Sequence, residues 1–201
     1  MENQCQCKWS MKSQIESDYH NREWGIPVSS DDIHFEFITL EGAQAGLSWH
    51  TILSKRLTYQ KAFKNFDIKE VAKFTQDNVE ELLQNKGIVR HKQKINSTIN
   101  NAQCFLNIQE EFGSFNKYIW SFVDFEPINN NWEDEAQVPS STGLSDTISK
   151  DLKKRGFKFV GSTTIYAYMQ ASGLVNDHVT SCFRHQDSLD AQKDFKKNIK
   201  K

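Results

Sequence analysis

The sequence has no uninterrupted apolar run approaching the roughly 18 residues that a membrane-spanning helix needs. Its first residues, MENQCQCKWSMK, lack the apolar core of a secretory signal, so we expect a cytoplasmic protein without a membrane partner. Internal repeats are absent, and strand signals are few. Because hydrophobic residues make up 37% and charged residues 25% of the 201 positions, the composition fits a folded globular chain and excludes wholesale disorder.

The sequence also lacks an excess of cationic charge, since 25 Lys and Arg stand against 26 Asp and Glu, for a formal net charge of −1. This balance argues against a protein that coats nucleic acid generally, although a local basic patch can still bind DNA. In a reducing compartment the four cysteines are not expected to form a disulfide framework. Metal ligands and buried thiols are the two interpretations that remain.

Helical signals dominate the rest of the chain. Ser30 and Asp31 are candidate caps for the first predicted helix. The apolar spacing predicts helices over residues 33–45, 49–55, 68–74, 78–84, 92–111, 145–155 and 163–172. Residues 124–143 contain Pro127 and Pro139 and are predicted to form a long surface connection. We therefore predict an all-α fold with one domain over residues 1–185, for which two lobes remain an alternative, and a lysine-rich tail over 186–201 that frays.

A short glycine-containing segment, residues 85–94, joins two of these predicted helices. Gly87 permits a tight turn with positive φ, and the next helix would present free backbone N–H groups together with Arg90, Lys92 and Lys94. Such a helix start suits a phosphate group. The alternative is an ordinary turn between helices with a solvated basic face. A second basic stretch fits that alternative better; it contains Lys150, Lys153, Lys154, Arg155 and Lys158.

Cysteine and histidine residues near both ends of the chain form a candidate zinc site. His178 and Cys182 are four residues apart, which places both on one face of a helix, and Cys7 and His20 lie near the N-terminus. Two sulfurs and two nitrogens suit tetrahedral zinc, and a site filled by four protein ligands is structural. Cys5 competes with Cys7 for this role. The alternative is that His178 is a hydrogen-bonded core histidine and Cys182 a buried thiol.

Aromatic residues and one glutamate gather in the first quarter of the sequence. Tyr19, Trp24 and Trp49, with Trp9 nearby, could sandwich a planar base, and the Glu41 carboxylate could accept hydrogen bonds from an exocyclic amine or favour a cationic ligand. The alternative is that Glu41 caps a backbone group or pairs with an arginine, while the tryptophans belong to the core.

Seven stretches of the sequence, in chain order, resemble 3-methyladenine DNA glycosylase I, the constitutive bacterial family. These stretches are residues 7–9, 19–25, 40–49, 87–91, 119–123, 153–161 and 169–178. The resemblance implies a helix-hairpin-helix glycosylase with one structural zinc. It implies the ligand set Cys7, His20, His178 and Cys182. It also implies that Glu41 contacts the adenine edge, Trp49 stacks on the base, Tyr19 completes the pocket, and Trp9 and Trp24 line it.

The resemblance further implies base-excision repair of double-stranded DNA that contains 3-methyladenine. The enzyme would flip the nucleotide out and hydrolyse its glycosidic bond, with Glu41 as the catalytic group, releasing free 3-methyladenine and leaving an abasic site. We expect DNA contacts from Gly87, Arg90, Lys92 and Lys94, and we expect Leu47 to fill the vacated stack. No lysine is assigned as a nucleophile, so we expect a monofunctional enzyme, and a monomer.

Two features depart from what related sequences lead us to expect. Glu16 stands where an aromatic residue is expected, and the lysine-rich tail is longer. In addition, no aspartate occurs between His91 and Phe112, so no such group can stabilise a developing sugar cation there. Two rival functions remain: a helix-hairpin-helix module that binds DNA without cutting it, and a zinc-stapled helical interaction domain without a nucleic-acid role.

Overall fold

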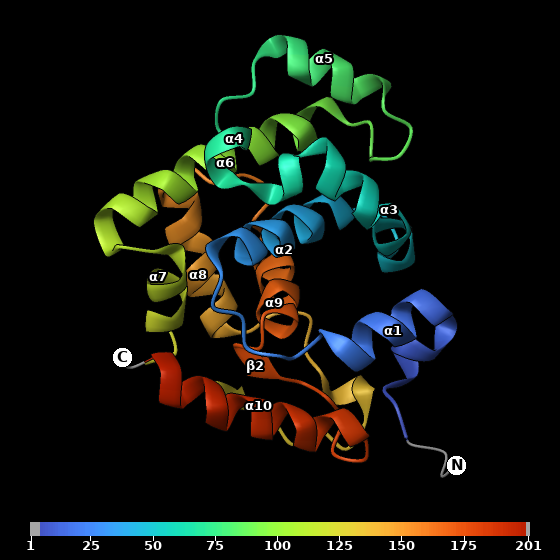
Figure 1. Ribbon diagram of the computed structural model, residues 1–201. Helices are drawn as coiled ribbons and strands as arrows, with labels where there is room; N and C mark the ends of the chain where they lie inside the picture. Colours follow the sequence, from blue (N-terminus) through green and yellow to red (C-terminus); the bar gives the residue numbers. More distant parts are fainter. Residues whose placement is uncertain (1–4, 200–201) are drawn as a thin grey trace.

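Helices form most of the computed structural model, which describes residues 5–199, with side chains described as far as residue 196 (Figure 1). The elements in chain order are η1 (Lys8–Lys12), α1 (Gln14–Arg22), α2 (Asp31–Gln44), α3 (Trp49–Ala62), η2 (Lys64–Phe66), α4 (Ile68–Val71), α5 (Gln76–Gln84), α6 (Lys92–Phe112), α7 (Phe115–Ser121), β1 (Ile128–Asn129), η3 (Glu135–Gln137), α8 (Gly143–Lys154), α9 (Ser162–Ala171), β2 (Val175–Asn176) and α10 (Phe183–Ile199). All seven predicted ranges contain a helix, as α2 to α6, α8 and α9, although α4 covers only the first four residues of the range 68–74. Helices α1, α7 and α10 were not predicted.

Helix α2 lies in the middle of the molecule, where α3, α6, α7 and α9 pack against it (Figure 1). Every residue from His34 to Ala43 is buried, so this helix has no solvent face over three turns. A helix buried on all sides belongs to the centre of a core. Beside it, the rings of Phe105 and Phe115 stack at 3.9 Å, which packs α6 and α7 against the same core.

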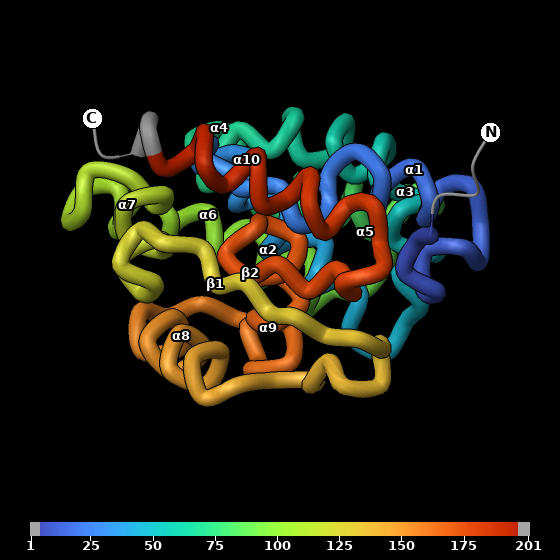
Figure 2. The backbone as a smooth tube through the Cα atoms, turned by 90° about the horizontal axis from the view of Figure 1, so that it is seen from below, coloured from blue at the N-terminus to red at the C-terminus, as the bar shows by residue number. Residues whose placement is uncertain are grey.

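A two-residue parallel pairing modifies the all-α prediction. Ile128 of β1 is in register with Val175 of β2, and Asn129 with Asn176 (Figure 2). The pairing lies inside the connection over residues 124–143, which is therefore held against the body of the protein near its C-terminal segment. Such a short strand has no sequence signal, because its register depends on where the chain lies in three dimensions rather than on alternation.

The predicted frayed tail is wrong over the described residues, because Phe183–Ile199 forms helix α10 (Figures 1 and 2). Its Phe195 ring lies 4.4 Å from the Trp120 ring, and Ser188 and Gln192 are buried on the same side. The tail has few apolar residues, but their spacing lets one face pack while Lys193 stays in solvent. The predicted tail residues Lys200 and Lys201 lie outside the described part, as does the side chain of Lys197. None of the described helices is both long and apolar enough to cross a membrane.

Candidate functional site

A cavity of about 280 Å³ lies between α1, the C-terminal half of α2, the start of α3 and α9. This volume is near the lower end of those found for small-molecule sites. The cavity brings together all five side chains that the sequence predicted for a base pocket. They are Trp9, Tyr19, Trp24, Glu41 and Trp49.

The local sequence explains how Glu41 and Trp49 come to face one cavity. Glu41 lies one turn before the end of α2, and Gly46, at φ +79°, turns the chain in a left-handed conformation that glycine adopts without strain. Ser48 then caps α3, because its hydroxyl accepts a hydrogen bond from the Thr51 N–H at 3.2 Å. Trp49 is the first residue of α3, so the turn places it opposite the last turns of α2.

Two polar groups of the cavity are buried without hydrogen-bond partners. Glu41 is 6% exposed, and among the described residues none makes a hydrogen bond or ion pair with it. Burial raises the pKa of Glu41 to about 8 from its ordinary 4.5. The Tyr19 hydroxyl is also buried and unpartnered, and burial, followed by the nearby Glu41 charge, raises its pKa well above the usual value. Unsatisfied buried groups are costly, so a cavity that keeps two of them is suited to a ligand that supplies the partners.

The structure answers the alternative that Glu41 pairs with an arginine. Arg56, the cation nearest to the Tyr19 ring, already holds two other acids. Its Nη1 lies 2.7 Å from the Glu23 carboxylate, and its Nε lies 2.8 Å from that of Glu36. Glu41 is left without a cationic partner among the described residues.

Several lining residues were missed by the sequence analysis; they are Gln44, Glu135, Val138, Ala167, Gln170 and Asp177. The Asp177 carboxylate is 3% exposed and accepts hydrogen bonds from Asn130, Trp132, Tyr166 and Gln170 at 2.6 to 2.8 Å. These bonds hold the Gln170 amide at the cavity wall. Only the position of Asp177 beside a predicted metal ligand could have drawn attention to it.

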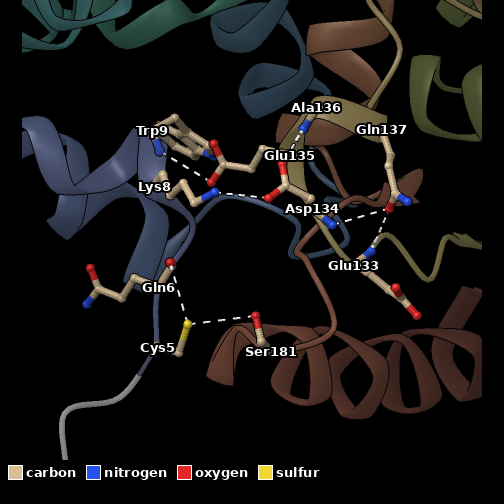
Figure 3. A network of polar contacts seen from close by, with 10 residues as sticks. All are labelled: Cys5, Gln6, Lys8, Trp9, Glu133, Asp134, Glu135, Ala136, Gln137 and Ser181. Carbon is tan, nitrogen blue, oxygen red and sulfur yellow. Dashed lines mark hydrogen bonds and ion pairs between the residues drawn. The ribbon is translucent and has the colours of Figure 1, made fainter.

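The connection over residues 124–143 helps to build the cavity. Figure 3 shows it tied to the N-terminal segment, where the Lys8 ammonium lies 3.0 Å from the Asp134 carboxylate and the Trp9 N–H donates to Glu135 at 3.4 Å. The Lys8–Asp134 pair is largely exposed, at 72% and 53%, so it contributes little stability. Its effect is to place Glu135 and Trp9 together at one edge of the cavity.

Glu16, where an aromatic residue is expected, lies beside the cavity and does not line it. Its carboxylate is buried, accepts a hydrogen bond from the Ser13 hydroxyl at 2.7 Å, and lies 3.9 Å from His50 Nδ1. Together with Trp49 it lines an adjoining groove. The wall formed by Tyr19 is therefore intact without an aromatic residue at position 16.

The predicted metal ligands Cys7, His20, His178 and Cys182 form one buried cluster, with all four ligand atoms within 4.8 Å of one another. His178 Nδ1 lies 3.1 Å from His20 Nε2. Cys182 Sγ lies 3.5 Å from His20 Nε2 and 3.7 Å from His178 Nδ1, and Cys7 Sγ lies 3.7 Å from His178 Nδ1. Tetrahedral zinc with bonds of about 2.0 to 2.3 Å requires ligand atoms roughly 3.3 to 3.8 Å apart, which is close to this arrangement. Cys5 is exposed beside Ser181 and is not part of the cluster (Figure 3).

The outer nitrogens of the two histidines suit a metal between them. His178 Nε2 lies 3.1 Å from the Trp24 carbonyl, and His20 Nδ1 lies 2.7 Å from the Asn21 side-chain oxygen. Both oxygens are acceptors, so each outer nitrogen carries a proton and each inner nitrogen presents a lone pair to the centre. Two facing lone pairs repel unless a cation lies between them. The donor set therefore fits a bound metal ion.

The segment around Gly87 differs in detail from the prediction. Gly87 does not adopt a positive φ; glycine is needed there because a Cβ would overlap the Thr58 side chain. Arg90 and Lys92 are exposed at the start of α6. Lys94 instead donates to the carbonyls of Ala43 and Ala45, at 2.8 and 2.6 Å, so its ammonium is occupied within the protein.

Two further residues concern the predicted DNA-binding face. Leu47 is 41% exposed at the turn between α2 and α3, beside the cavity. Arg155 of the second basic stretch pairs with Glu111 and Asp151, each at 2.7 Å, so its charge is compensated. The exposed cations nearest the turn at Gly87 are those within residues 85–94.

These features define a class: a mostly helical protein with an acidic, aromatic cavity and an adjoining cysteine–histidine cluster that joins its two terminal segments. The profile of the methyladenine glycosylase family matches residues 9–185. The chain belongs to the methyladenine glycosylase family.

Relatives and solved structures agree with this assignment. The chain is 46% identical over 176 residues to the DNA-3-methyladenine glycosylase of Haemophilus influenzae, covering 88% of this chain and 95% of that protein. It is equally similar to DNA-3-methyladenine glycosylase 1 of Escherichia coli, with 88% and 94% covered. A crystal structure of 3-methyladenine DNA glycosylase I superposes with a TM-score of 0.87 at 46% identity, covering 89% of this chain and 98% of the other. The Staphylococcus aureus enzyme, solved to explain its recognition of 3-methyladenine, gives 0.86 at 34% identity, with 89% and 95% covered.

Proposed function

We propose that this chain is a DNA-3-methyladenine glycosylase of base-excision repair. It flips 3-methyladenine out of double-stranded DNA, hydrolyses the bond between the base and the sugar, and leaves an abasic site. The observation that carries the proposal is the unpartnered Glu41 carboxyl in an aromatic cavity. The relatives that bear this activity in their names match nearly the whole chain.

Recognition rests on charge and shape. A base methylated at N3 and still bound to the sugar is a flat cation, and the cavity offers it Trp9, Trp24 and Trp49 together with the unpartnered carboxyl of Glu41. Normal adenine is neutral, so Glu41 stays protonated beside it and no ion pair forms. Selectivity therefore comes from the ion pair that only a cationic base can make in this cavity.

The protonation state of Glu41 changes when the substrate enters. With a pKa of about 8 in the free protein, Glu41 is mostly protonated at neutral pH. A cationic base favours the ionised carboxylate, so its entry expels the proton. The resulting ion pair holds the flipped base in a site with little water.

The chemistry needs little from the protein beyond this placement. Water attacks the sugar carbon and releases one proton to solvent, while the glycosidic bond breaks and its electron pair neutralises the departing base, so the leaving group needs no proton. Glu41 stabilises the bound cation and orients it for departure. No lysine acts as a nucleophile, and the product is an intact abasic site.

DNA binding is assigned to the segment around Gly87, as a helix-hairpin-helix element. Arg90 and Lys92 are exposed there beside the first backbone N–H groups of α6, and both features suit phosphate contacts that carry no sequence information. Leu47, exposed beside the cavity, fills the space that the flipped nucleotide leaves. The enzyme acts as a monomer, in the cytoplasm.

Cys7, His20, His178 and Cys182 hold one structural zinc ion. Four protein ligands leave no position for an activated water, so the ion supplies rigidity to the terminal segments and no chemistry at the base. Metal analysis should find about one zinc per chain, and Cys182→Ser should lose it and melt at lower temperature. A metal-free protein with unchanged melting would contradict this assignment.

The decisive experiment measures base release from methylated double-stranded DNA. Glu41→Gln should lower 3-methyladenine release about 100-fold or more, in line with the loss of a buried electrostatic contact. Glu81→Gln, an exposed glutamate on α5, is the matched control and should release the base at the normal rate. Normal release by Glu41→Gln would remove Glu41 from the mechanism, and no release by the unmodified protein would reject the function.

A further inference from the structure

Lys94 is the one predicted DNA-binding cation whose ammonium is occupied within the protein. Its Nζ lies 2.8 Å from the Ala43 carbonyl and 2.6 Å from the Ala45 carbonyl, and burial lowers the pKa of this ammonium. The neighbouring Lys92, two residues earlier on α6, is exposed and makes no such contact with the described residues. At the start of one helix, the ammonium of Lys94 is therefore bound within the protein, whereas that of Lys92 is open to solvent.

The carbonyls that Lys94 holds are at the C-terminal end of α2. The last four carbonyls of a helix have no partner within the helix, and this end carries partial negative charge. The last turn of α2 contains no basic residue of its own. Lys94 supplies the missing cation from α6, across 49 to 51 positions of sequence.

This end of α2 positions the residues to which the proposed function assigns roles. Glu41 precedes Ala43 by two residues, and the turn after Ala45 leads through Gly46 to Leu47 and Trp49. The turn is otherwise held by a hydrogen bond from the Leu47 N–H to the Gln44 carbonyl at 2.6 Å. Gly46 has open space around it, so no packing contact at that residue fixes the turn.

On the far side, Lys94 lies in the first turn of α6, directly after Arg90 and Lys92. Its own carbonyl accepts hydrogen bonds from Ser97 and Thr98, at 2.7 and 3.1 Å. The His91 ring caps the same turn through the Lys94 N–H at 3.4 Å. The side chain thus extends from a well-anchored helix start to an otherwise weakly held turn.

We propose that Lys94 is a positioning residue, which fixes the α2–α3 turn and with it Glu41, Leu47 and Trp49, and links their placement to the phosphate-binding start of α6. The inference rests on the proposed function for the identity of the ligand. Lys94 touches neither the base nor a phosphate.

The test compares Lys94→Met with Lys92→Met in the full-length, metal-loaded protein. Lys94→Met should lower the single-turnover rate of base release about 10-fold while DNA affinity changes less than 2-fold. It should also weaken the binding of free 3-methyladenine, which has no phosphate. Lys92→Met should instead lower DNA affinity and the salt dependence of that affinity, and it should leave the binding of free 3-methyladenine unchanged. Lys94→Arg, which keeps two donors, should recover part of the rate.

Amide hydrogen exchange gives a readout that does not depend on catalysis. Exchange over residues 43–49 should rise in Lys94→Met and stay unchanged in Lys92→Met. If Lys94→Met lost DNA affinity in parallel with Lys92→Met and bound the free base normally, Lys94 would be a phosphate contact and the inference would be overturned. A lower melting temperature with an unchanged rate and unchanged exchange over 43–49 would also overturn it. Failure of the unmodified protein to release the base would reject the proposed function alone, because the exchange comparison still decides the role of Lys94.

Discussion

The two ends of α2 each bury a titratable side chain, but they treat it differently. At the N-terminal end, His34 is fully buried and bonded on both ring nitrogens, to the Tyr168 hydroxyl at 2.7 Å and to the Asn116 side chain at 3.2 Å. At the C-terminal end, Glu41 is equally enclosed and has no partner among the described residues. At the N-terminal end of this helix both ring nitrogens of the buried side chain have hydrogen-bond partners, and at the C-terminal end the buried carboxyl has none. We call these the finished end and the unfinished end.

The burial of His34 and Asp31 stabilises the fold, whereas the burial of Glu41 serves the site. Asp31, near His34, accepts hydrogen bonds from two backbone N–H groups and from Gln109, at 2.7 to 2.9 Å, so that region stabilises the fold by itself. Glu41 instead costs folding free energy when it is ionised. Sites that bind charged ligands commonly retain such strain, and stability is lost there in exchange for recognition.

The largest expected effect on stability is at the finished end. His34→Leu removes two hydrogen bonds and leaves the Tyr168 hydroxyl buried without a partner, so the free energy of unfolding should fall by about 2 to 4 kcal/mol. Denaturant unfolding measures this change. Base release per folded molecule should stay normal, and a loss of activity in the folded fraction would break the distinction between the two ends.

A gain is expected at the unfinished end. The pKa of Glu41 is about 8 in the folded protein against 4.5 ordinarily, so between these values the folded state binds the extra proton and stability falls as pH rises. Glu41→Gln removes this loss and should raise the free energy of unfolding at pH 8 by about 1 to 3 kcal/mol, with almost no gain at pH 4. Equal melting temperatures of the two proteins at pH 8 would show that Glu41 is not strained.

His34 should give the opposite pH slope. Burial lowers its pKa to about 4 from 6.5, so the folded state binds fewer protons between these values and stability rises with pH over that window. Unfolding measured at pH 4.5 and pH 6.5 should show this rise in the unmodified protein and lose it in His34→Leu. An unchanged slope in the variant would assign the rise to other groups.

The smallest expected effect is at the edge of the finished network. Asn116→Ala removes one of the two bonds to His34, and the free energy of unfolding should fall by about 1 kcal/mol, which is roughly 2 to 4 °C in melting temperature for a chain of this size. Thermal melting is sensitive enough for this comparison. A loss as large as that of His34→Leu would mean that the two bonds act as one unit.

The sequence predicted much of the site but not how it is closed. Glu41 and Trp49 lie only eight residues apart, so a helix, a glycine turn and a capped helix were enough to place them together. Asp177 and Glu135 could not be assigned to the same cavity, because the connection that carries Glu135 is held by contacts with residues more than 40 positions away. The contacts of Gly87 and Lys94 could not be predicted for the same reason: they are made with Thr58 and Ala43, and neither is near in sequence.

The unpredicted helices have a related explanation. Helix α1 is short and polar and is ordered by the cluster and cavity that it helps to form. Helix α10 has a strongly charged sequence, and its buried face became evident only where Phe183 and Phe195 meet residues from distant segments. Local propensity is a weak guide wherever tertiary contacts supply most of the stabilisation.

The cysteine–histidine cluster takes two of its members from residues 7 and 20 and the other two from residues 178 and 182. During synthesis the first pair leaves the ribosome long before the second, so the cluster can close only after residue 182 has been made. Trp9, Tyr19 and Trp24 lie on the N-terminal segment that carries the first pair, and they form one wall of the cavity. A chain made only as far as α9 thus contains the central helices but lacks the cluster that ties this wall to the C-terminal segment.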